Sequence, residues 1–116
     1  MLKITPWGFY KKFYYQKNSK NAIWIKEIFI KEGEATSLQL HKKRDEHFFY
    51  VSGKGEIIIG SERIQFNPFN KEPIVCFRED KHRIIGGAKG LTIIEVAEGN
   101  LKENDIIRYE DNYGRK

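Results

Sequence analysis

The stretch "EHFFYVSGKGEIIIG", residues 46–60, decides the fold that the sequence predicts. It holds two short runs of aromatic and β-branched residues, with a glycine-containing turn signal between them. Five further runs of this kind lie along the chain, at 22–30, 63–66, 73–77, 82–85 and 91–99, and "GGAKG" (86–90) is the turn signal between the last two. No segment repeats its apolar residues at the spacing of an amphipathic helix. The sequence therefore predicts an all-β fold, either a sandwich or a small barrel.

The length of the chain, its tail and its cysteine indicate how the domain is organised. Its 116 residues predict a single domain, 1–116, without a linker, an internal repeat or a low-complexity segment. The tail from residue 101 is polar apart from one apolar pair, and we expect a helical turn there that packs back on the sheet. The only cysteine, Cys76, lies in the apolar run "PIVCF" and is expected to be a core residue. A chain that cannot form an internal disulfide fits a reducing compartment.

The charge pattern favours a small anionic ligand. The formal net charge is +5, and residues 10–20 interleave basic and aromatic side chains in a way that would suit single-stranded nucleic acid. Because acidic residues are spread through the chain, we expect a strand with one solvated face there and no nucleic-acid partner. No apolar run approaches the roughly 18 residues of a membrane span, and the N-terminus lacks a signal-peptide core. We therefore predict a cytoplasmic protein with no membrane partner, whose positive field attracts an anionic metabolite.

Three nitrogen or oxygen donors, Gln39, His41 and Glu46, lie within eight residues of one another. Gln39 and His41 are two apart, so their side chains point to the same side of an extended chain. Four residues then form a short connection before Glu46, and a hairpin here would return Glu46 beside the first two donors. A fourth donor, His82, lies at the end of a later strand.

This donor set has the chemistry of a metal site. Two imidazoles, one carboxylate and one amide oxygen suit a divalent ion such as Zn, Mn, Co, Ni or Fe. Each residue alone has a simpler interpretation, as a polar strand residue that binds water or backbone. Their spacing favours the metal, so we predict one divalent ion held by Gln39, His41, Glu46 and His82. A neutral amide in place of a second acid leaves the site with net positive charge, which suits a Lewis acid.

The same residues resemble the motifs of the cupins. The first cupin motif is matched by Gly33, Gln39, His41, Glu46 and Gly53, and the single histidine of the second by His82. Within the cupins the chain resembles the type II mannose-6-phosphate isomerase domain, in "PWGFY" (6–10), residues 36–53, "HRI" (82–84) and residues 93–115. The resemblance implies a cupin double-stranded β-helix, a jelly-roll barrel. It also implies interconversion of mannose 6-phosphate and fructose 6-phosphate, by proton transfer between C1 and C2.

Two departures from the family pattern affect substrate choice more than metal binding. The family's Pro-x-Gly before the second-motif histidine is Phe77-Arg78-Glu79 here, and the asparagine four residues after that histidine is Gly86. We expect the loop around His82 to be reshaped. The chain also contains no glycine-rich triphosphate-binding motif, so we expect no pyrophosphorylase activity from these residues.

Three residues are candidates for the base that takes the carbon-bound proton: Glu46, His47 and Lys26. Glu46 is expected to be occupied as a ligand, and strand alternation points His47 to the opposite face. Lys26 interrupts "AIWIKEIFI" (22–30), whose even positions are apolar. If the even positions face the interior, Lys26 does too, and loss of solvent favours its neutral form. If the odd positions face inward, Lys26 is merely solvated, and the sequence leaves both orientations open.

The phosphate of the substrate requires basic side chains. Arg44 matches the arginine of the family's metal-binding loop, and a guanidinium offers a two-pronged fork for phosphate. Arg108 and Arg115 lie in the matching tail, where the alternative is an ion pair with Glu110 or Asp111. Trp7 either stacks on a sugar or packs in the core.

Two other functions and one assembly state also follow from these features. The first alternative is a sugar- or nucleotide-sugar-binding cupin of surface-polysaccharide synthesis, either a different isomerase or epimerase or non-catalytic. The second is an iron oxygenase that uses His41, His82 and Glu46, although Gln39 as a fourth ligand would leave fewer open positions. We also predict a homodimer, because the long apolar run 22–30 would be a hazard at a sheet edge.

Overall fold

The structure, a computed structural model, describes residues 2–18 and 21–116. The described residues form nine strands: β1 (Leu2–Thr5), β2 (Gly8–Asn18), β3 (Asn21–Ile30), β4 (Leu38–Leu40), β5 (Arg44–Ile59), β6 (Glu62–Phe66), β7 (Ile74–Cys76), β8 (His82–Gly99) and β9 (Ile107–Glu110). Within these ranges no helix has the length and apolar character needed to cross a membrane. The all-β prediction is confirmed.

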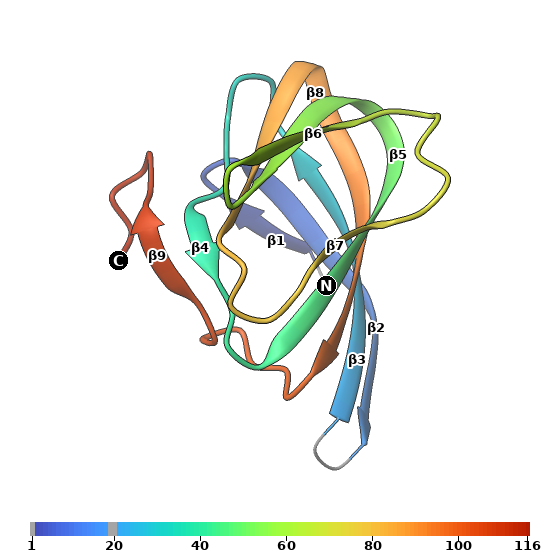
Figure 1. Cartoon of the computed structure of the whole chain (residues 1–116), viewed down its shortest axis with the longest axis vertical. Helices are drawn as coiled ribbons and strands as arrows, with labels where there is room; N and C mark the ends of the chain where they lie inside the picture. The colour runs from blue at the N-terminus through green and yellow to red at the C-terminus, as the bar shows by residue number, and fades with distance from the viewer. Residues whose placement is uncertain (1, 19–20) are drawn as a thin grey trace.

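The strands form one curled antiparallel sheet (Figure 1). One path through it runs β1-β2-β3-β8-β4-β9, and β5 pairs with β6, β7 and β8. Strand β8 therefore joins the two parts, since β5 pairs with both of its halves, β3 pairs with its residues 91–99, and β4 pairs with it at His82. The curl leaves a concave face, which holds the core and the pocket, and a convex face.

Two predicted turns are in fact bends within continuous strands. We expected "SGKG" to separate two strands, and "GGAKG" two more, yet β5 and β8 each run through these glycines. The two segments pair with each other, with Gly53 opposite Leu91 and Gly55 opposite Gly86, and the register shifts there. Gly53 has φ 84° and the carbonyl oxygen of Gly90 lies 2.1 Å from where a Cβ would be, so only glycine fits. Bulges of this kind bend a strand without ending it, and here they curl the sheet.

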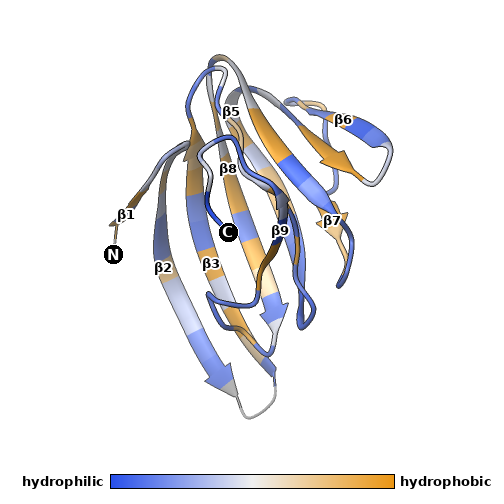
Figure 2. Cartoon of the chain, turned by 90° about the vertical axis from the view of Figure 1, so that its left-hand side faces the viewer, coloured by the Kyte–Doolittle hydropathy of each residue, from blue (hydrophilic) through white to orange (hydrophobic). Residues whose placement is uncertain are grey.

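Alternation along β3 decides the orientation of Lys26. The even positions of β3 are buried, from Ala22 through Trp24 and Ile28 to Ile30, and Lys26 lies among them with 5% of its surface exposed. In Figure 2 a hydrophilic band interrupts this otherwise hydrophobic strand. The structure thus places Lys26 on the concave face.

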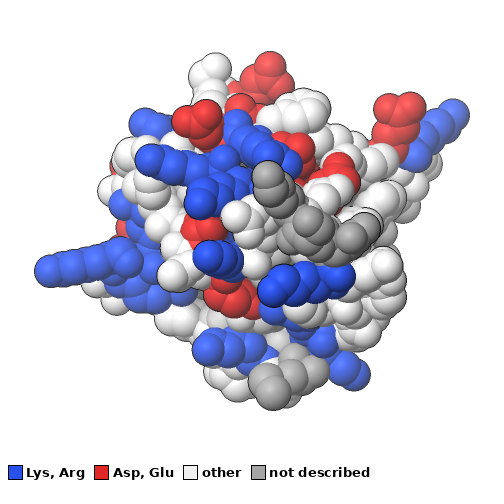
Figure 3. All heavy atoms as spheres, turned by 90° about the horizontal axis from the view of Figure 1, so that it is seen from below, with Lys and Arg blue, Asp and Glu red and all other residues white. Residues whose placement is uncertain are grey.

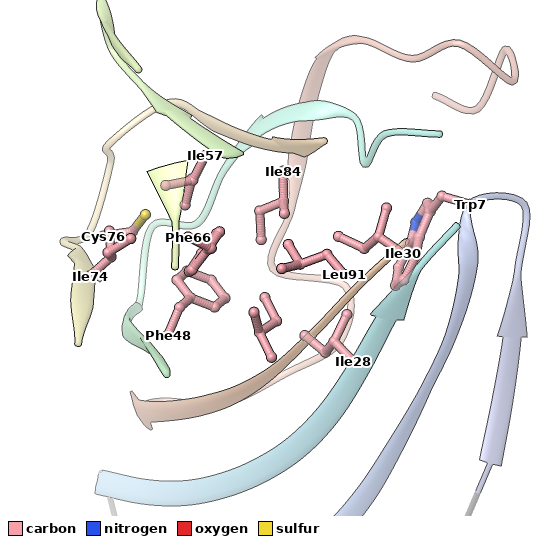
Figure 4. Packing of buried hydrophobic residues seen from close by; sticks show 11 residues of the cluster. Trp7, Ile28, Ile30, Phe48, Ile57, Phe66, Ile74, Cys76, Ile84 and Leu91 are labelled. Carbon is pink, nitrogen blue, oxygen red and sulfur yellow. The ribbon is translucent and has the colours of Figure 1, made fainter. Parts of the chain in front are cut away.

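The core fills one half of the concave face (Figure 4). Eleven buried residues from the loop before β2 and from five strands form one cluster: Trp7, Ile28, Ile30, Phe48, Ile57, Phe66, Ile74, Cys76, Ile84, Leu91 and Ile93. Trp7 lies at one end of the cluster beside Ile30, and Cys76 lies at the other. The prediction that Cys76 is a core residue is confirmed, since 1% of it is exposed.

The tail differs from the expected helical turn. Its residues 107–110 form β9, which pairs with β4 and satisfies the backbone groups that β4 would otherwise present as an edge. Strand β3, for its part, lies between β2 and β8 and is no edge. The reason that we gave for a homodimer is therefore wrong, and the homodimer itself stays a prediction that light scattering tests.

Candidate metal centre

The metal donors are brought together by a route other than the predicted hairpin. Strand β4 pairs with β8 and β9 and not with β5, so Glu46 does not return beside Gln39 in a ladder. The connection instead crosses from β4 to β5, and the carboxylate of Asp105 holds it by accepting hydrogen bonds from the backbone amides of Lys42 and Lys43. Strand β8 adds the fourth donor, because His82 is the register partner of Gln39.

Three of the four predicted donors converge on one point. Glu46 Oε1 lies 3.1 Å from His82 Nε2 and 3.4 Å from His41 Nε2. One ligand atom from each of these residues lies within 4.8 Å of the other two, and all three residues are buried. The amide nitrogen of Gln39 is 3.2 Å from His41 Nε2. The amide oxygen accepts a 2.6 Å hydrogen bond from the Ser37 hydroxyl, and a half-turn of the amide would present this oxygen to the metal donors while its nitrogen donates to Ser37.

Hydrogen bonds fix which ring nitrogens face the centre. His41 Nδ1 lies 2.6 Å from the carbonyl oxygen of Asp105, and His82 Nδ1 lies 3.0 Å from that of Asp80. A carbonyl oxygen only accepts, so each Nδ1 carries a proton and each Nε2 of a neutral ring turns a lone pair toward Glu46. Backbone carbonyls that orient ligand histidines in this way are usual around protein metals.

The donor set fits a divalent cation. Glu46 Oε1 is buried and faces the Nε2 atoms of both histidines, at 3.1 Å from His82 and 3.4 Å from His41. Lone pairs from two imidazoles and a carboxylate repel one another unless a proton or a metal lies between them. Burial alone would raise the pKa of Glu46, but hydrogen bonds with His41 and His82 and the nearby Arg44 hold that pKa well below its usual value. Burial alone would lower the pKa of His82, yet Glu46 raises it. In the metal-free protein, a proton held between His82 and Glu46 therefore offsets the charge of the buried carboxylate.

Arg44 lies against the donor set rather than at the mouth of the pocket. It is 6% exposed, its Nη2 is 3.0 Å from His41 Nε2, and its Nε is 3.3 Å from Glu46 Oε2. The guanidinium also lies 5.0 Å from the ring centroid of Trp24. Arg44 therefore supplies positive charge beside the ligands.

A pocket of about 220 Å³ opens beside this group. Every predicted site residue except His41 lines it: Trp7, Lys26, Gln39, Arg44, Glu46, His82, Arg108 and Arg115. His41 lies behind its wall. Trp7 packs in the core and also lines the pocket, and stacking on a sugar stays a prediction. His47 is half-buried on the opposite face, as alternation predicted.

Lys26 lies in the wall of the pocket among aromatic rings. Its ammonium is 4.1 Å from the ring centroid of Trp24 and 4.3 Å from that of Tyr10. It donates a hydrogen bond of 3.0 Å to Glu103, which also pairs with Lys12 at 2.8 Å. Glu103 belongs to the segment between β8 and β9, so this segment closes one side of the pocket over Lys26.

Glu95 is a pocket residue that the sequence reasoning missed. It is the register partner of both Lys26 and Phe48, is 5% exposed, and accepts a 2.8 Å hydrogen bond from the indole of Trp24. Burial and the charge of Glu46 raise its pKa to about 7. A signal was present: Glu95 is the one acid in phase with Leu91, Ile93 and Ala97, the inward residues of an apolar strand.

The two tail arginines differ in their partners. Arg115 forms the ion pair with Asp111 that was the alternative for these residues, with 2.9 Å and 2.8 Å between the paired atoms. Arg108 donates to the carbonyl oxygen of Lys116 and keeps a buried Nε that has no hydrogen-bond partner among the described residues.

The altered loop before His82 keeps that ligand in place. Glu79, at the position of the family's glycine, has φ 69°, in the left-handed region that glycine favours. Its backbone amide donates to the carbonyl oxygen of His41, and the amide of Arg78 donates to Asp45. The loop is therefore tied to both ligand-bearing segments.

Comparisons with known proteins agree with this geometry. The chain is 34% identical over 111 residues to the xanthan biosynthesis protein XanB of Xanthomonas campestris, covering 95% of this chain and 23% of that protein. It is 36% identical over 112 residues to the alginate biosynthesis protein AlgA of Pseudomonas putida, covering 95% of this chain and 22% of that protein. The chain thus spans less than a quarter of the length of these relatives.

The fold is shared with the capsular polysaccharide assembling protein CapF of Staphylococcus aureus, at a TM-score of 0.73 and 19% identity. That match covers 96% of this chain and 32% of CapF, and it confirms the predicted cupin fold. The model of the family described as "Mannose-6-phosphate isomerase C-terminal" matches residues 3–111, a range that includes the donor group, β9 and every pocket residue except Arg115. The chain belongs to this family of mannose-6-phosphate isomerase C-terminal cupin domains.

Proposed function

We propose that this domain is a metal-dependent aldose–ketose isomerase of sugar phosphates, which interconverts mannose 6-phosphate and fructose 6-phosphate. The observation that carries the proposal is the convergence of His41, Glu46 and His82, with Gln39 beside them, at the wall of a pocket. The family to which the chain belongs supports it. A divalent ion held by these residues would act as a Lewis acid for the sugar oxygens at C1 and C2.

The remaining work is proton transfer, and the pocket offers two ionisable groups for it outside the ligands. Lys26 and Glu95 are register partners that both line the pocket. A group that moves a proton between C1 and C2 must reach both carbons from one face of the sugar, which adjacent side chains on one sheet face can do. Lys26 and Glu95 are our candidates for that role, and removal of the one that moves the proton should slow turnover by about 10²–10⁴.

Arg44 supplies positive charge beside the donors, and Trp24 packs against its guanidinium. Arg44 lies beside His41 and Glu46 with its guanidinium against the indole of Trp24, so it stabilises negative charge that develops on a substrate oxygen near the ligands. A lysine would place a point charge on a flexible stem and lose the planar fork. We expect Arg44→Lys to lose most activity and to keep its metal.

The test is isotope exchange with net isomerisation. Metal-loaded wild-type protein in deuterated water should wash label into C1 or C2 of the sugar phosphate and convert mannose 6-phosphate to fructose 6-phosphate. Glu46→Gln should do neither, while Glu62→Gln, which changes an exposed acid at the start of β6, should behave as wild type. If the metal-loaded wild type shows no exchange and no conversion, the isomerase is ruled out.

A further inference from the structure

The register of the sheet turns Lys3 toward the concave face. Lys3 is opposite Tyr10, Tyr10 is opposite Ile28, and Ile28 is opposite Ile93. Residues in one such row point to the same side of a sheet, and here Ile28 and Ile93 are core residues. The neighbours of Lys3 on its own strand, Leu2 and Ile4, are 57% and 71% exposed on the other side. Lys3 accordingly lines the pocket from β1.

A second row turns Arg108 toward the same pocket. Arg108 is opposite Gln39, which is opposite His82, so Arg108 lies in one row with two of the predicted ligands. Arg108 is half-buried between the exposed Ile107 and Tyr109. Strands β1 and β9 are the two ends of one path through the sheet, yet both contribute a basic side chain to one pocket.

The charges at this side of the pocket are unbalanced. The pocket's acids have basic neighbours: Arg44 lies against Glu46, Lys26 opposite Glu95, and Lys12 and Lys26 pair with Glu103. Among the described residues Lys3 has no ion pair, and Arg108 keeps its unpartnered Nε. Burial and the neighbouring Arg115 both lower the pKa of Arg108, the second by repulsion of like charges. Arg115 in turn has Asp111 across its fork.

Lys3, Arg108 and Arg115 line one pocket, and Asp111 is paired with Arg115, so three positive charges meet one negative charge and suit an anion. A phosphate monoester carries close to two negative charges at neutral pH and accepts several charge-assisted hydrogen bonds. The face seen from below in Figure 3 also shows many lysine and arginine side chains around fewer acids, which favours approach of an anion.

We infer that Lys3 and Arg108, with Arg115 behind them, form a phosphate subsite that is separate from Arg44 and the metal donors. This rests on the proposed function, because the subsite holds the phosphate while the donor group faces the reacting end of the sugar. It assigns a substrate role to Lys3, and it moves the phosphate anchor from Arg44 to the two end strands of the path. The bound phosphate would then tie β1 to β9 across the pocket.

The test is binding measured without turnover. Calorimetry on metal-loaded protein would compare mannose 6-phosphate, unphosphorylated mannose, inorganic phosphate and GDP-mannose. Arg108→Gln and Lys3→Gln should each bind mannose 6-phosphate about tenfold to a hundredfold more weakly, with mannose unaffected. Lys71→Gln, an exposed lysine in the loop before β7, is the matched control and should bind as wild type. Added salt should weaken wild-type binding more than that of the variants.

Hydrogen exchange gives a second readout that a loss of folding would not imitate. Mannose 6-phosphate should slow amide exchange in residues 2–5 and 107–110 of the wild type and not of Arg108→Gln. If Arg108→Gln keeps wild-type affinity for mannose 6-phosphate, or if inorganic phosphate and mannose 6-phosphate protect neither strand, the subsite is wrong even where isomerisation continues. Arg108-dependent binding in a protein that does not isomerise would support the subsite and reject the isomerase. Arg108-dependent binding of GDP-mannose alone would reject the monoester as ligand.

Discussion

The two halves of the concave face use the same strands for opposite purposes. Toward one end, β3 and β8 turn Ile28, Ile30, Leu91 and Ile93 inward, and none of these is more than 7% exposed. Toward the other end, the same two strands and β5 turn charged residues inward: Lys26, Arg44, Glu46 and Glu95, all of them 6% exposed or less. One half is a hydrocarbon core and the other is an ionic cluster of equal burial.

The difference indicates which half stabilises the fold and which half holds the candidate site. Removing apolar surface from water contributes roughly 25 cal/mol per Å². Burying charges costs free energy unless each is paired, and a hydrophobic replacement of a buried ion pair is often neutral or stabilising. The buried charges of the ionic half therefore contribute little to the stability of the fold, which supports a functional reason for their presence. Changes in the two halves should have separable effects on stability and on the metal.

The largest expected effect lies in the ionic half, at His41. His41→Ala should lose its bound metal, and with it turnover, because it removes a lone pair that faces Glu46. Chelation should lower the melting temperature of the wild type and have little effect on the variant, since metal binding to the folded state adds stability. Elemental analysis after desalting and thermal melts measure both.

The matched control is His47→Ala, which removes a histidine of β5 that points to the opposite face. It should keep a full equivalent of metal. A His41→Ala protein that also retained a full equivalent would show that the ligand set is a different one.

The next largest effect lies in the apolar half, at Ile93. Ile93 is fully buried, so Ile93→Ala should lower the free energy of unfolding by about 2–5 kcal/mol. Ile94→Ala, one residue along and on the half-buried outer face, should cost less. Urea denaturation measures both, and elemental analysis should find the metal of Ile93→Ala unchanged. Loss of metal in Ile93→Ala at temperatures where it is folded would show that the two halves are not separable.

Local sequence patterns predicted the strands and most residues of the ionic half. Period-two alternation in 22–30 left two orientations for Lys26, and the spacing of Gln39, His41 and Glu46 pointed to a shared site. The partners of β4 could not be derived, because pairing between distant strands depends on the whole sheet rather than on neighbouring residues. The glycine segments at 53–55 and 86–90 read as turns because the same glycines serve a bulge when two strands bend together. Glu95 was missed because one acid in an apolar strand has no local partner to mark it.

A smaller effect should appear at Glu95 in the metal-free protein as a function of pH. Burial and Glu46 raise its pKa from 4.5 to about 7, against the opposing charges of Lys26 and Arg44. The folded protein then holds a proton that the unfolded chain has released, so the free energy of unfolding falls as pH rises from 4.5 to about 7. Glu95→Gln cannot ionise and should lack this fall. Urea denaturation with a chelator present, at pH values below and above this window, measures the difference.

The control for Glu95 is Glu62→Gln, an exposed acid whose removal should leave the pH profile of the wild type unchanged. The two shifted groups among the metal donors act largely outside this pH window. Glu46 has a lowered pKa, so its contribution to the free energy of unfolding is lost only as pH falls below 4.5. His82 has a raised pKa, so its contribution is lost as pH rises beyond 6.5. A Glu95→Gln protein with the same fall between 4.5 and about 7 as the wild type would show that Glu95 is ionised throughout.

The smallest effect is expected at Glu79, where the ionic half meets the altered loop. Its φ of 69° costs a side-chain-bearing residue about 1–2 kcal/mol, and glycine removes that cost while losing about 0.5–1 kcal/mol through its freer unfolded chain. Glu79→Gly should therefore raise the free energy of unfolding by about 1 kcal/mol or less, because the amide of residue 79 still donates to His41. Glu79→Val, a β-branched residue in the same conformation, should lower it. Metal content should stay at the wild-type level in Glu79→Gly, since His82 is held by β8 and by the carbonyl of Asp80. A glycine variant that is less stable than the wild type would mean that the Glu79 side chain, and not its backbone, holds the loop over the metal ligands.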